Sequence, residues 1–272
     1  MSNTVQIDIP ARSKEQSEIL IAQLSEINFD AFEEKENSLS AYINEEDFNE
    51  AELNNVLSQK NISYTKKIIE ETNWNAKWES EFEPIVIEDF VAIRASFHKP
   101  IANVQHEIII TPKMSFGTGH HATTWLMLQQ MQRIDFTGKS VLDFGTGTGI
   151  LAIMAKKLGA KKVTAIDNDV LSINNANENI IANNGSDIAL IQKDNLDDLK
   201  SFDIILANIN LNVISGSLQQ LKVISHPSAV LLLSGFLITD KQTLINNFMA
   251  EGFKYISSME KDNWLSMLII KP

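Results

Sequence analysis

The chain has 272 residues, of which 44% are hydrophobic and 21% charged, and its formal net charge at pH 7 is −12. This composition is typical of a soluble globular protein with a buried core, and the longest strongly apolar run, residues 229–238, is too short to span a bilayer. The absence of cysteine excludes disulfides, thiolate catalysis and zinc–thiolate sites.

The negative charge is concentrated in the first quarter of the chain. Residues 1–71 hold 15 Asp or Glu against 6 Lys or Arg, a net charge of −9. Two interpretations stay open: a solvated surface that favours solubility, or a docking face for a basic partner protein. The acidic balance argues against direct nucleic-acid binding, which needs a basic face for phosphates. Since no apolar stretch follows a basic start at the N-terminus, we expect no signal peptide, a cytoplasmic location and no membrane partner.

Residues 1–71 predict a small acidic α+β domain. The hydrophobic periodicity indicates a strand, a helix, a hairpin, a helix and a strand, over residues 4–10, 13–27, 29–46, 47–61 and 62–71. This order, β-α-β-β-α-β, is that of a ferredoxin-like sandwich. Many functions share that fold, so it indicates none of them.

Finer signals within this domain predict helix starts and a buried strand face. Capping boxes are expected at Ser13 with Gln16 and at Asp47 with Glu50. The second arm of the hairpin alternates, so its inward side chains should be Leu39, Ala41 and Ile43.

We expect residues 72–83 to form a linker helix. Trp74, Trp78 and Phe82 recur every four residues, which places an aromatic stripe along one side of a helix. We expect this stripe to pack between two domains rather than to bind a cofactor. β-rich segments follow at 84–94 and 106–112.

Strands and helices alternate in the remainder of the expected second domain, residues 84–272. Nearly continuous apolar runs, typical of parallel strands buried on both faces, predict strands over residues 139–145, 162–168, 188–194, 202–209 and 229–236. Helices are expected between them, for example over 150–159 and 172–184, and the last twenty residues predict a terminal hairpin. The expected fold is a Rossmann-like, doubly wound, mostly parallel α/β sheet closed by that hairpin.

The tetrapeptide Phe-Gly-Thr-Gly occurs at 116–119 and again at 144–147. In the second copy, Gly145, Gly147 and Gly149 follow the first strand of the α/β alternation, where a tight turn exposes a helix N-terminus to an anionic group. Ile150 stands where a dinucleotide fingerprint has its third glycine. We therefore expect Gly145 and Gly147 to bind a cofactor other than a nicotinamide dinucleotide.

Two acidic residues end the next two strands. Asp167 is placed to accept hydrogen bonds from both hydroxyls of a ribose, and Asp194 is placed to reach an adenine amino group, although solvation in a loop is an equally open interpretation of Asp194. Asp169 is the better candidate for a helix N-cap. A glycine loop, an acidic strand end and a terminal hairpin together predict an S-adenosylmethionine-dependent methyltransferase.

The first Phe-Gly-Thr-Gly, at 116–119, lies between a strand and a helix that is expected to begin near Ala122. Adjacent histidines diverge, so we expect no metal site at His120 and His121.

The chain resembles the ribosomal protein L11 methyltransferase (PrmA) family over nearly its whole length. The resemblance is carried by the stretches at 110–124, 141–153, 165–169 and 207–209, with the linker at 73–78. The pattern FGTGxHxTT is specific, whereas the glycine loop alone is not.

This resemblance implies a class I methyltransferase fold, S-adenosylmethionine as donor without a metal, and multiple methylation of lysine side chains and the N-terminal amine on a basic large-subunit ribosomal protein. The acidic first domain would recognise that substrate, and we expect the enzyme to act as a monomer. Matching positions imply that the cofactor is bound by Thr124, Gly145, Asp167 and Asn208. Phe116 and Gly117 would cover its methionine end and belong to the reaction centre.

Asn208 also has the clearest expected catalytic role. Its side-chain carbonyl would accept hydrogen bonds from a neutral amine, whereas a carboxylate in that place would stabilise the unreactive ammonium. A strand-end cap is the competing interpretation. Two departures from the family pattern are the intervening threonines of the glycine loop and the polar stretch 210–214. The second could alter the amine pocket.

Three other functions stay open. The nearest is a methyltransferase that acts on another protein or on a small molecule. A nicotinamide-dependent oxidoreductase is disfavoured by Ile150 and would be revealed by tight NADH binding. A non-catalytic adaptor would bind the ribosomal protein without consuming the donor.

Overall fold

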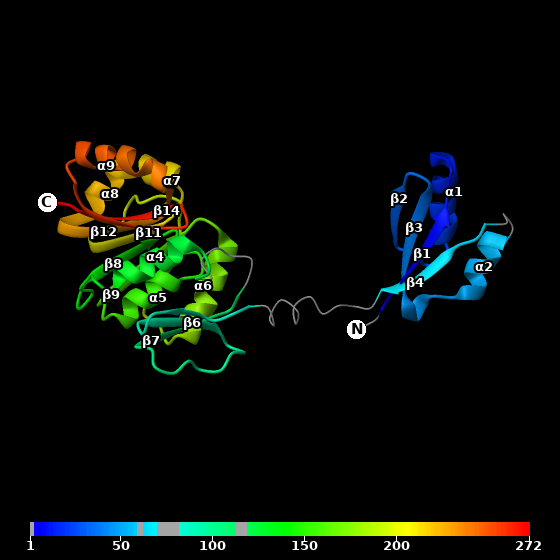
Figure 1. Ribbon diagram of the computed structural model, residues 1–272, viewed down its shortest axis with the longest axis horizontal. Helices are drawn as coiled ribbons and strands as arrows, with labels where there is room; N and C mark the ends of the chain where they lie inside the picture. The colour runs from blue at the N-terminus through cyan, green and yellow to red at the C-terminus, as the bar shows by residue number, and fades with distance from the viewer. Residues whose placement is uncertain (1–2, 59–61, 70–81, 113–118) are drawn as a thin grey trace. The chain divides into compact units, whose positions relative to one another are not determined.

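The computed structural model describes residues 3–58, 62–69, 82–112 and 119–272. The chain divides into two compact units, Met1–Glu81 and Phe82–Pro272 (Figure 1). Among the helices within these ranges, none combines the length and apolar character that a bilayer span requires.

The first unit contains a four-stranded sheet covered by two helices. The strands are β1 (Thr4–Pro10), β2 (Ala31–Lys35), β3 (Ser38–Asn44) and β4 (Thr65–Ile69), in the order β2-β3-β1-β4 with antiparallel neighbours. Helices α1 (Lys14–Ser25) and α2 (Glu50–Ser58) supply the buried leucines that pack with the strands in one core. The predicted order of elements is confirmed, and it is that of a ferredoxin-like sandwich.

The predicted cap of α1 is confirmed with one change. Ser13 Oγ accepts a hydrogen bond from the Gln16 N–H at 3.2 Å, whereas Gln16 Oε1 accepts from the N–H of Arg12, one residue before the cap, at 2.9 Å. The predicted inward face of β3 is also confirmed, because at most 1% of each residue is exposed for Leu39, Ala41 and Ile43.

The predicted capping box at Asp47 and Glu50 is wrong. Asp47 ends a short 3-10 helix, η1 (Glu45–Asp47), and α2 begins only at Glu50. Asn49 Oδ1 accepts from the N–H groups of Ala51 and Glu52 at 3.0 and 3.4 Å, so it caps α2. Both Asp47 and Asn49 are residue types that favour helix starts, and the extra 3-10 turn decides between them.

Two predicted features lie outside the described residues: the helix expected over 72–83, apart from its last two positions, and the first Phe-Gly-Thr-Gly, apart from Gly119. Phe82 is described and only 8% exposed. Its ring meets that of His120 edge to face, with 4.7 Å between centroids.

The second unit is built on a seven-stranded sheet in the order β10-β9-β8-β11-β12-β14-β13 (Figure 1). Its strands are β8 (Ser140–Phe144), β9 (Lys162–Asp167), β10 (Ala189–Gln192), β11 (Phe202–Asn208), β12 (Ser225–Leu237), β13 (Lys254–Lys261) and β14 (Trp264–Ile270). The five strands from β10 to β12 in the sheet order are parallel to one another. β14 lies between β12 and β13 and is antiparallel to both. The expected Rossmann-like sheet with a terminal hairpin is confirmed.

Helices cover both faces of this sheet. Side chains alternate along the buried strands, so Val141 joins the core on one face and Leu142 the core on the other. The first face is covered by α4 (Ala122–Met131), α5 (Ile150–Lys157) and α6 (Val170–Ala182). The second is covered by α7 (Leu211–Gly216), α8 (Leu218–Ile224) and α9 (Lys241–Ala250).

A small sheet packs beside α4, α5 and α6. It consists of β5 (Ile85–Ile87), β6 (Val91–Ala95) and β7 (His106–Ile110), with β5 antiparallel and β7 parallel to β6. The guanidinium of Arg94 forms a two-pronged pair with Glu107, at 2.8 and 2.9 Å. Hydrogen bonding from Arg94 lowers the pKa of Glu107, which also accepts from the Ile101 N–H and so holds the connection between β6 and β7.

Candidate active site

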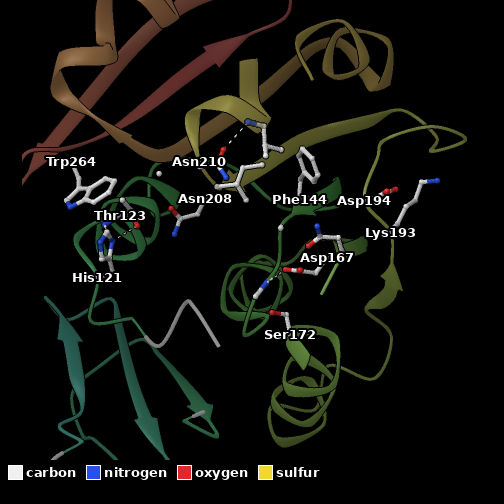
Figure 2. Close-up of a pocket in the computed structure, with 16 residues that line it drawn as sticks. His121, Thr123, Phe144, Asp167, Ser172, Lys193, Asp194, Asn208, Asn210 and Trp264 are labelled. Atoms are coloured by element: carbon white, nitrogen blue, oxygen red, sulfur yellow. Dashed lines mark hydrogen bonds between the residues drawn. The ribbon is translucent and has the colours of Figure 1, made fainter. Parts of the chain in front are cut away.

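A cavity of about 500 Å³ lies at the carboxyl ends of the parallel strands (Figure 2). This edge of an open α/β sheet is where such folds bind ligands. Figure 2 shows Asp167 and Asp194 toward one side of the cavity and His121 and Trp264 toward the other. The lining residues are His121, Thr123, Phe144, Gly145, Gly147, Asp167, Asn168, Ser172, Lys193, Asp194, Asn208, Ile209, Asn210, Val213, Gly235 and Trp264.

The second Phe-Gly-Thr-Gly forms the floor of this cavity between β8 and α5. The φ angles of Gly145, Gly147 and Gly149 are +74°, +54° and +80°, a region that residues with a Cβ rarely adopt. The N–H groups of Gly145 and Thr146 both donate to the Ile166 carbonyl at 2.9 Å, which fixes the loop to β9.

Gly145 and Gly235 allow Ile209 to approach the loop. A Cβ on Gly145 would stand 2.2 Å from Ile209 Cγ2, and a Cβ on Gly235 would stand 2.2 Å from the Ile209 carbonyl oxygen. Gly235 has a φ of +101° and lies where the pairing of β12 with β14 shifts register. The sequence analysis missed Gly235, although a glycine inside an apolar strand is a known sign of a bulge or a close backbone approach.

Asp167 closes the loop from the end of β9. Its Oδ2 accepts from the Gly147 N–H at 2.9 Å, and its Oδ1 accepts from the Asp169 N–H at 3.0 Å. Asp169 caps α6 by accepting from the N–H groups of Leu171 and Ser172, which confirms the predicted cap. Asp167 therefore both lines the cavity and holds the glycine loop in place.

Asp194 also lines the cavity, two residues beyond the end of β10. Its Oδ1 accepts a hydrogen bond from Asn195 Nδ2 at 2.8 Å. Lys193 beside it also lines the cavity, and no motif in the sequence pointed to it.

Asp143 lies beneath the glycine loop and is fully buried. Its Oδ2 accepts from the Thr146 hydroxyl at 2.6 Å and from the Ala152 N–H at 3.1 Å, so it joins the loop to the first turn of α5. Its Oδ1 has no hydrogen-bond partner among the described residues. Burial raises the pKa of Asp143 to about 7.

Asn208 and Thr124 come together from β11 and α4. Asn208 Nδ2 donates to Thr124 Oγ1 at 3.3 Å. The Asn208 carbonyl oxygen is buried and accepts no hydrogen bond from any residue that the structure describes. Thr124 is fully buried and does not line the cavity. It meets the site through its hydrogen bond with Asn208.

An aromatic pair borders the other side of the cavity. His121 caps α4, with its Nδ1 3.3 Å from the Thr123 nitrogen, and its ring meets Trp264 edge to face at 4.7 Å. The ring of His120 instead contacts Phe82, so the two histidines diverge as predicted. The sequence analysis did not select Thr123 or Trp264 as site residues. Trp264 comes to the start of α4 only through the docking of the terminal hairpin.

Most predicted site residues that the structure describes converge on this cavity: Gly145, Gly147, Asp167, Asp194 and Asn208 line it, and Thr124 contacts Asn208. Phe116 and Gly117 lie outside the described residues. The cavity therefore combines a glycine loop, an acidic strand end and a buried amide carbonyl for which the described residues supply no hydrogen-bond donor.

Comparisons with known proteins agree with this arrangement. Residues 2–272 match the sequence profile of the family described as Ribosomal protein L11 methyltransferase (PrmA). The chain is 38% identical over 262 residues to the ribosomal protein L11 methyltransferase of Bacteroides fragilis, covering 93% of this chain and 94% of the relative. It is 39% identical over 258 residues to the protein of the same name from Porphyromonas gingivalis, covering 92% and 89%.

Solved structures show the same likeness. The crystal structure of a ribosomal protein L11 methylase from Lactobacillus delbrueckii subsp. bulgaricus aligns with a TM-score of 0.65 and 30% identity, covering 69% of this chain and 98% of that one. A methyltransferase from Pyrococcus furiosus, 18% identical with a TM-score of 0.52, shares the fold. The chain belongs to the ribosomal protein L11 methyltransferase (PrmA) family.

Proposed function

We propose that this protein transfers methyl groups from S-adenosylmethionine to amines of ribosomal protein L11, on lysine side chains and at the N-terminus. One observation carries the proposal. Asn208 lines the cavity, and its buried side-chain carbonyl oxygen accepts no hydrogen bond from any described residue. Family membership and the glycine loop support the donor, and the names of the relatives support the acceptor protein.

The residues present fit the donor. Gly145, Gly147 and Gly235 line the cavity, and because they lack a Cβ they present backbone to a ligand there. In this proposal Gly145 and Gly147 contact the donor through their backbone, Asp167 accepts from its ribose hydroxyls, and Asp194 accepts from its adenine amino group. Phe116 and Gly117 would cover its methionine end. The bound donor supplies a sulfonium-activated methyl group, and no metal is required.

The acceptor amine must be neutral to react. With a pKa near 10.4, a free lysine is neutral in only about one molecule in 2,500 at pH 7. Desolvation in the cavity lowers that pKa, and the uncharged side-chain carbonyl of Asn208 can orient the amine while stabilising the ammonium less than a carboxylate would. Thr124, by accepting from Asn208 Nδ2, keeps the Asn208 carbonyl free for this role.

The first unit supports a basic protein substrate. Residues 1–71 carry a net charge of −9, and the acidic residues of the β2–β3 hairpin, Glu33, Glu34 and Glu36, are all exposed. An acidic surface attracts a basic ribosomal protein and speeds its association. We propose residues 1–71 as the substrate-recognition domain, residues 72–83 as a linker and residues 84–272 as the catalytic domain. The proposed substrate makes the cytoplasm the expected location, and the enzyme is proposed to act as a monomer.

The test uses purified protein, labelled S-adenosylmethionine and a ribosomal-protein extract from cells that lack the methylase. The proposal predicts a single labelled band, at L11, and a mass of L11 that rises in steps of one CH2 located on amines. This result supports the donor, the acceptor protein and the transfer of several methyl groups. Donor binding without that band overturns the proposed acceptor and leaves a methyltransferase with another substrate. Binding of NADH instead of S-adenosylmethionine overturns the proposed donor.

The role of the acidic hairpin is tested in the full-length enzyme. Replacing Glu33, Glu34 and Glu36 by Gln is expected to raise KM for L11, with most of the effect lost at high salt, because screening weakens exposed charges. Replacing Asp197 and Asp198 of the second unit by Asn removes charge elsewhere and is the control. Equal effects of the two sets would contradict recognition by the first unit.

A further inference from the structure

Asn179 of α6 is a fully buried amide whose two ends bond to separate parts of the second unit. Its Oδ1 accepts from the Thr111 N–H at 2.7 Å. Its Nδ2 donates to the Thr148 carbonyl at 2.8 Å and to Asn175 Oδ1 at 2.8 Å. Both polar ends of this buried side chain are therefore satisfied, which is the condition under which such a network specifies one geometry.

These bonds join the small sheet to the glycine loop. Thr148 lies between Gly147 and Gly149 in the loop that follows β8, whereas Thr111 follows the last residue of β7. A glycine-rich loop has little conformational preference of its own, so its shape depends on external hydrogen bonds. The Thr148 carbonyl receives such a bond from Asn179.

The same small sheet also supports the end of the first Phe-Gly-Thr-Gly. A Cβ on Gly119 would stand 2.7 Å from Ile93 Cδ1 and 2.9 Å from Ile85 Cδ1, so Gly119 packs directly on β6 and β5. The end of the first tetrapeptide and the loop that continues from the second are thus both attached to this sheet. Gly119 packs on it directly, and Thr148 is joined to it through Asn179 and Thr111.

Asn183, the C-cap residue that follows α6 one turn beyond Asn179, provides an internal comparison. Its Oδ1 accepts from the Ile109 N–H at 3.0 Å, and its Nδ2 donates to the Ile109 carbonyl at 2.6 Å and to the Asn179 carbonyl at 2.8 Å. Asn183 therefore ties the same helix to the same strand as Asn179, and its side-chain bonds go to β7 and α6 rather than to the glycine loop.

We propose that Asn179 is a positioning residue for donor binding, which holds the Thr148 carbonyl and so fixes the glycine loop against β7. This rests on the proposed function, in which the glycine loop receives S-adenosylmethionine. A loop held in its bound shape binds more tightly because it loses less conformational freedom on binding. The effect reaches the donor through the loop backbone, since Asn179 is not one of the cavity-lining residues.

The test compares Asn179→Asp with Asn183→Asp in the full chain. In each variant one oxygen can still accept from its backbone N–H partner, Thr111 for residue 179 and Ile109 for residue 183, and the donor to a backbone carbonyl is lost. Thermal unfolding and the calorimetric Kd for S-adenosylmethionine are measured at a temperature where both variants are folded. We expect both to lose stability, and Asn179→Asp alone to weaken donor binding, by about tenfold or more.

An unchanged donor affinity in Asn179→Asp, or an equal loss in Asn183→Asp, overturns the proposal. Absence of donor binding by the wild-type enzyme contradicts the proposed function instead. Amide hydrogen exchange on the wild type tests the same link if Asn179→Asp does not fold. Binding of S-adenosylhomocysteine should slow exchange at the Thr111 N–H more than at the Ile109 N–H, and equal changes overturn the proposal.

Discussion

The side-chain amide of Asn208 donates to Oγ1 of Thr124 across 3.3 Å, which orients the Asn208 carbonyl away from that bond and leaves it without a described donor. A buried carbonyl with no partner is costly to a fold unless it has a ligand. The pair therefore combines a structural role for Thr124 with a proposed substrate-binding role for Asn208.

Asn208→Asp is expected to lower methyl transfer about ten- to thousandfold, because a carboxylate raises the pKa of a nearby amine by about 1–3 units and depletes the neutral form. The measurement is kcat for methylation of L11, with the donor Kd measured beside it. Asn210→Asp is the matched control, since Asn210 also lines the cavity and caps α7 through Val213, a role that Asp can also fill. An equal loss in both variants would assign the effect to added charge alone.

Thr124→Val should reduce kcat about fivefold, the usual effect of one hydrogen bond, while donor affinity changes little. The change removes the acceptor that orients Asn208 and keeps the buried volume. Thr124→Ser retains a hydroxyl and should restore most of the activity. A larger effect on the donor Kd than on kcat would instead support the direct cofactor contact that the sequence predicted for Thr124.

Asp167→Ala is expected to weaken S-adenosylmethionine binding by at least about tenfold, because it removes both the proposed ribose acceptor and the bond to Gly147. Isothermal titration calorimetry measures this. Asp169→Ala should cost about 1 kcal/mol of unfolding free energy as a lost helix cap, with a small effect on donor affinity. Wild-type affinity in Asp167→Ala would contradict the assignment.

Alanine at Gly145 and at Gly235 should both impair donor binding, but with different responses to Ile209→Ala. The clash at Gly145 is with the Ile209 side chain, so removing that side chain should recover part of the affinity. The clash at Gly235 is with the Ile209 carbonyl, which every residue retains, so no recovery is expected. Equal recovery of donor affinity in the two variants would contradict this distinction, because it would show that the Ile209 backbone shifts when its side chain is removed.

Asp143 gives the folding stability a defined pH dependence. Its folded pKa of about 7 lies above the ordinary value of 3.8, so between these values the folded state holds a proton that the unfolded state has released. Stability from this residue therefore falls as pH rises toward 7. Asp143→Asn should flatten the dependence, measured as the free energy of unfolding in urea between about pH 5 and about pH 8.

Asp203→Asn is the control for this pH prediction. Hydrogen bonding from Ser140 lowers the pKa of Asp203, so its contribution is lost only in acid, as pH falls through that lowered value. The control should leave the slope between about pH 5 and about pH 8 unchanged. An unchanged slope in Asp143→Asn would contradict a proton on Asp143 in this range.

The sequence alone determined the order of elements in both units, because the period of apolar residues differs between strands and helices. It also marked Gly145, Gly147 and Asp167, since each lies at or beside the end of a strand in an α/β alternation, where ligands bind. Asn208 was marked by the resemblance to the family. The capping box at Asp47 failed because two suitable caps lie two residues apart and local pattern cannot choose between them.

Only the tertiary structure decided which distant residues meet. Trp264 reaches His121 because β14 inserts between β12 and β13, and Gly235 matters because Ile209 folds against it. Asn179 offered no signal in the sequence, since an asparagine within a helix is ordinary until its partners are known. Local patterns follow from backbone geometry within a few residues, whereas these contacts depend on the packing of segments that are distant in the chain.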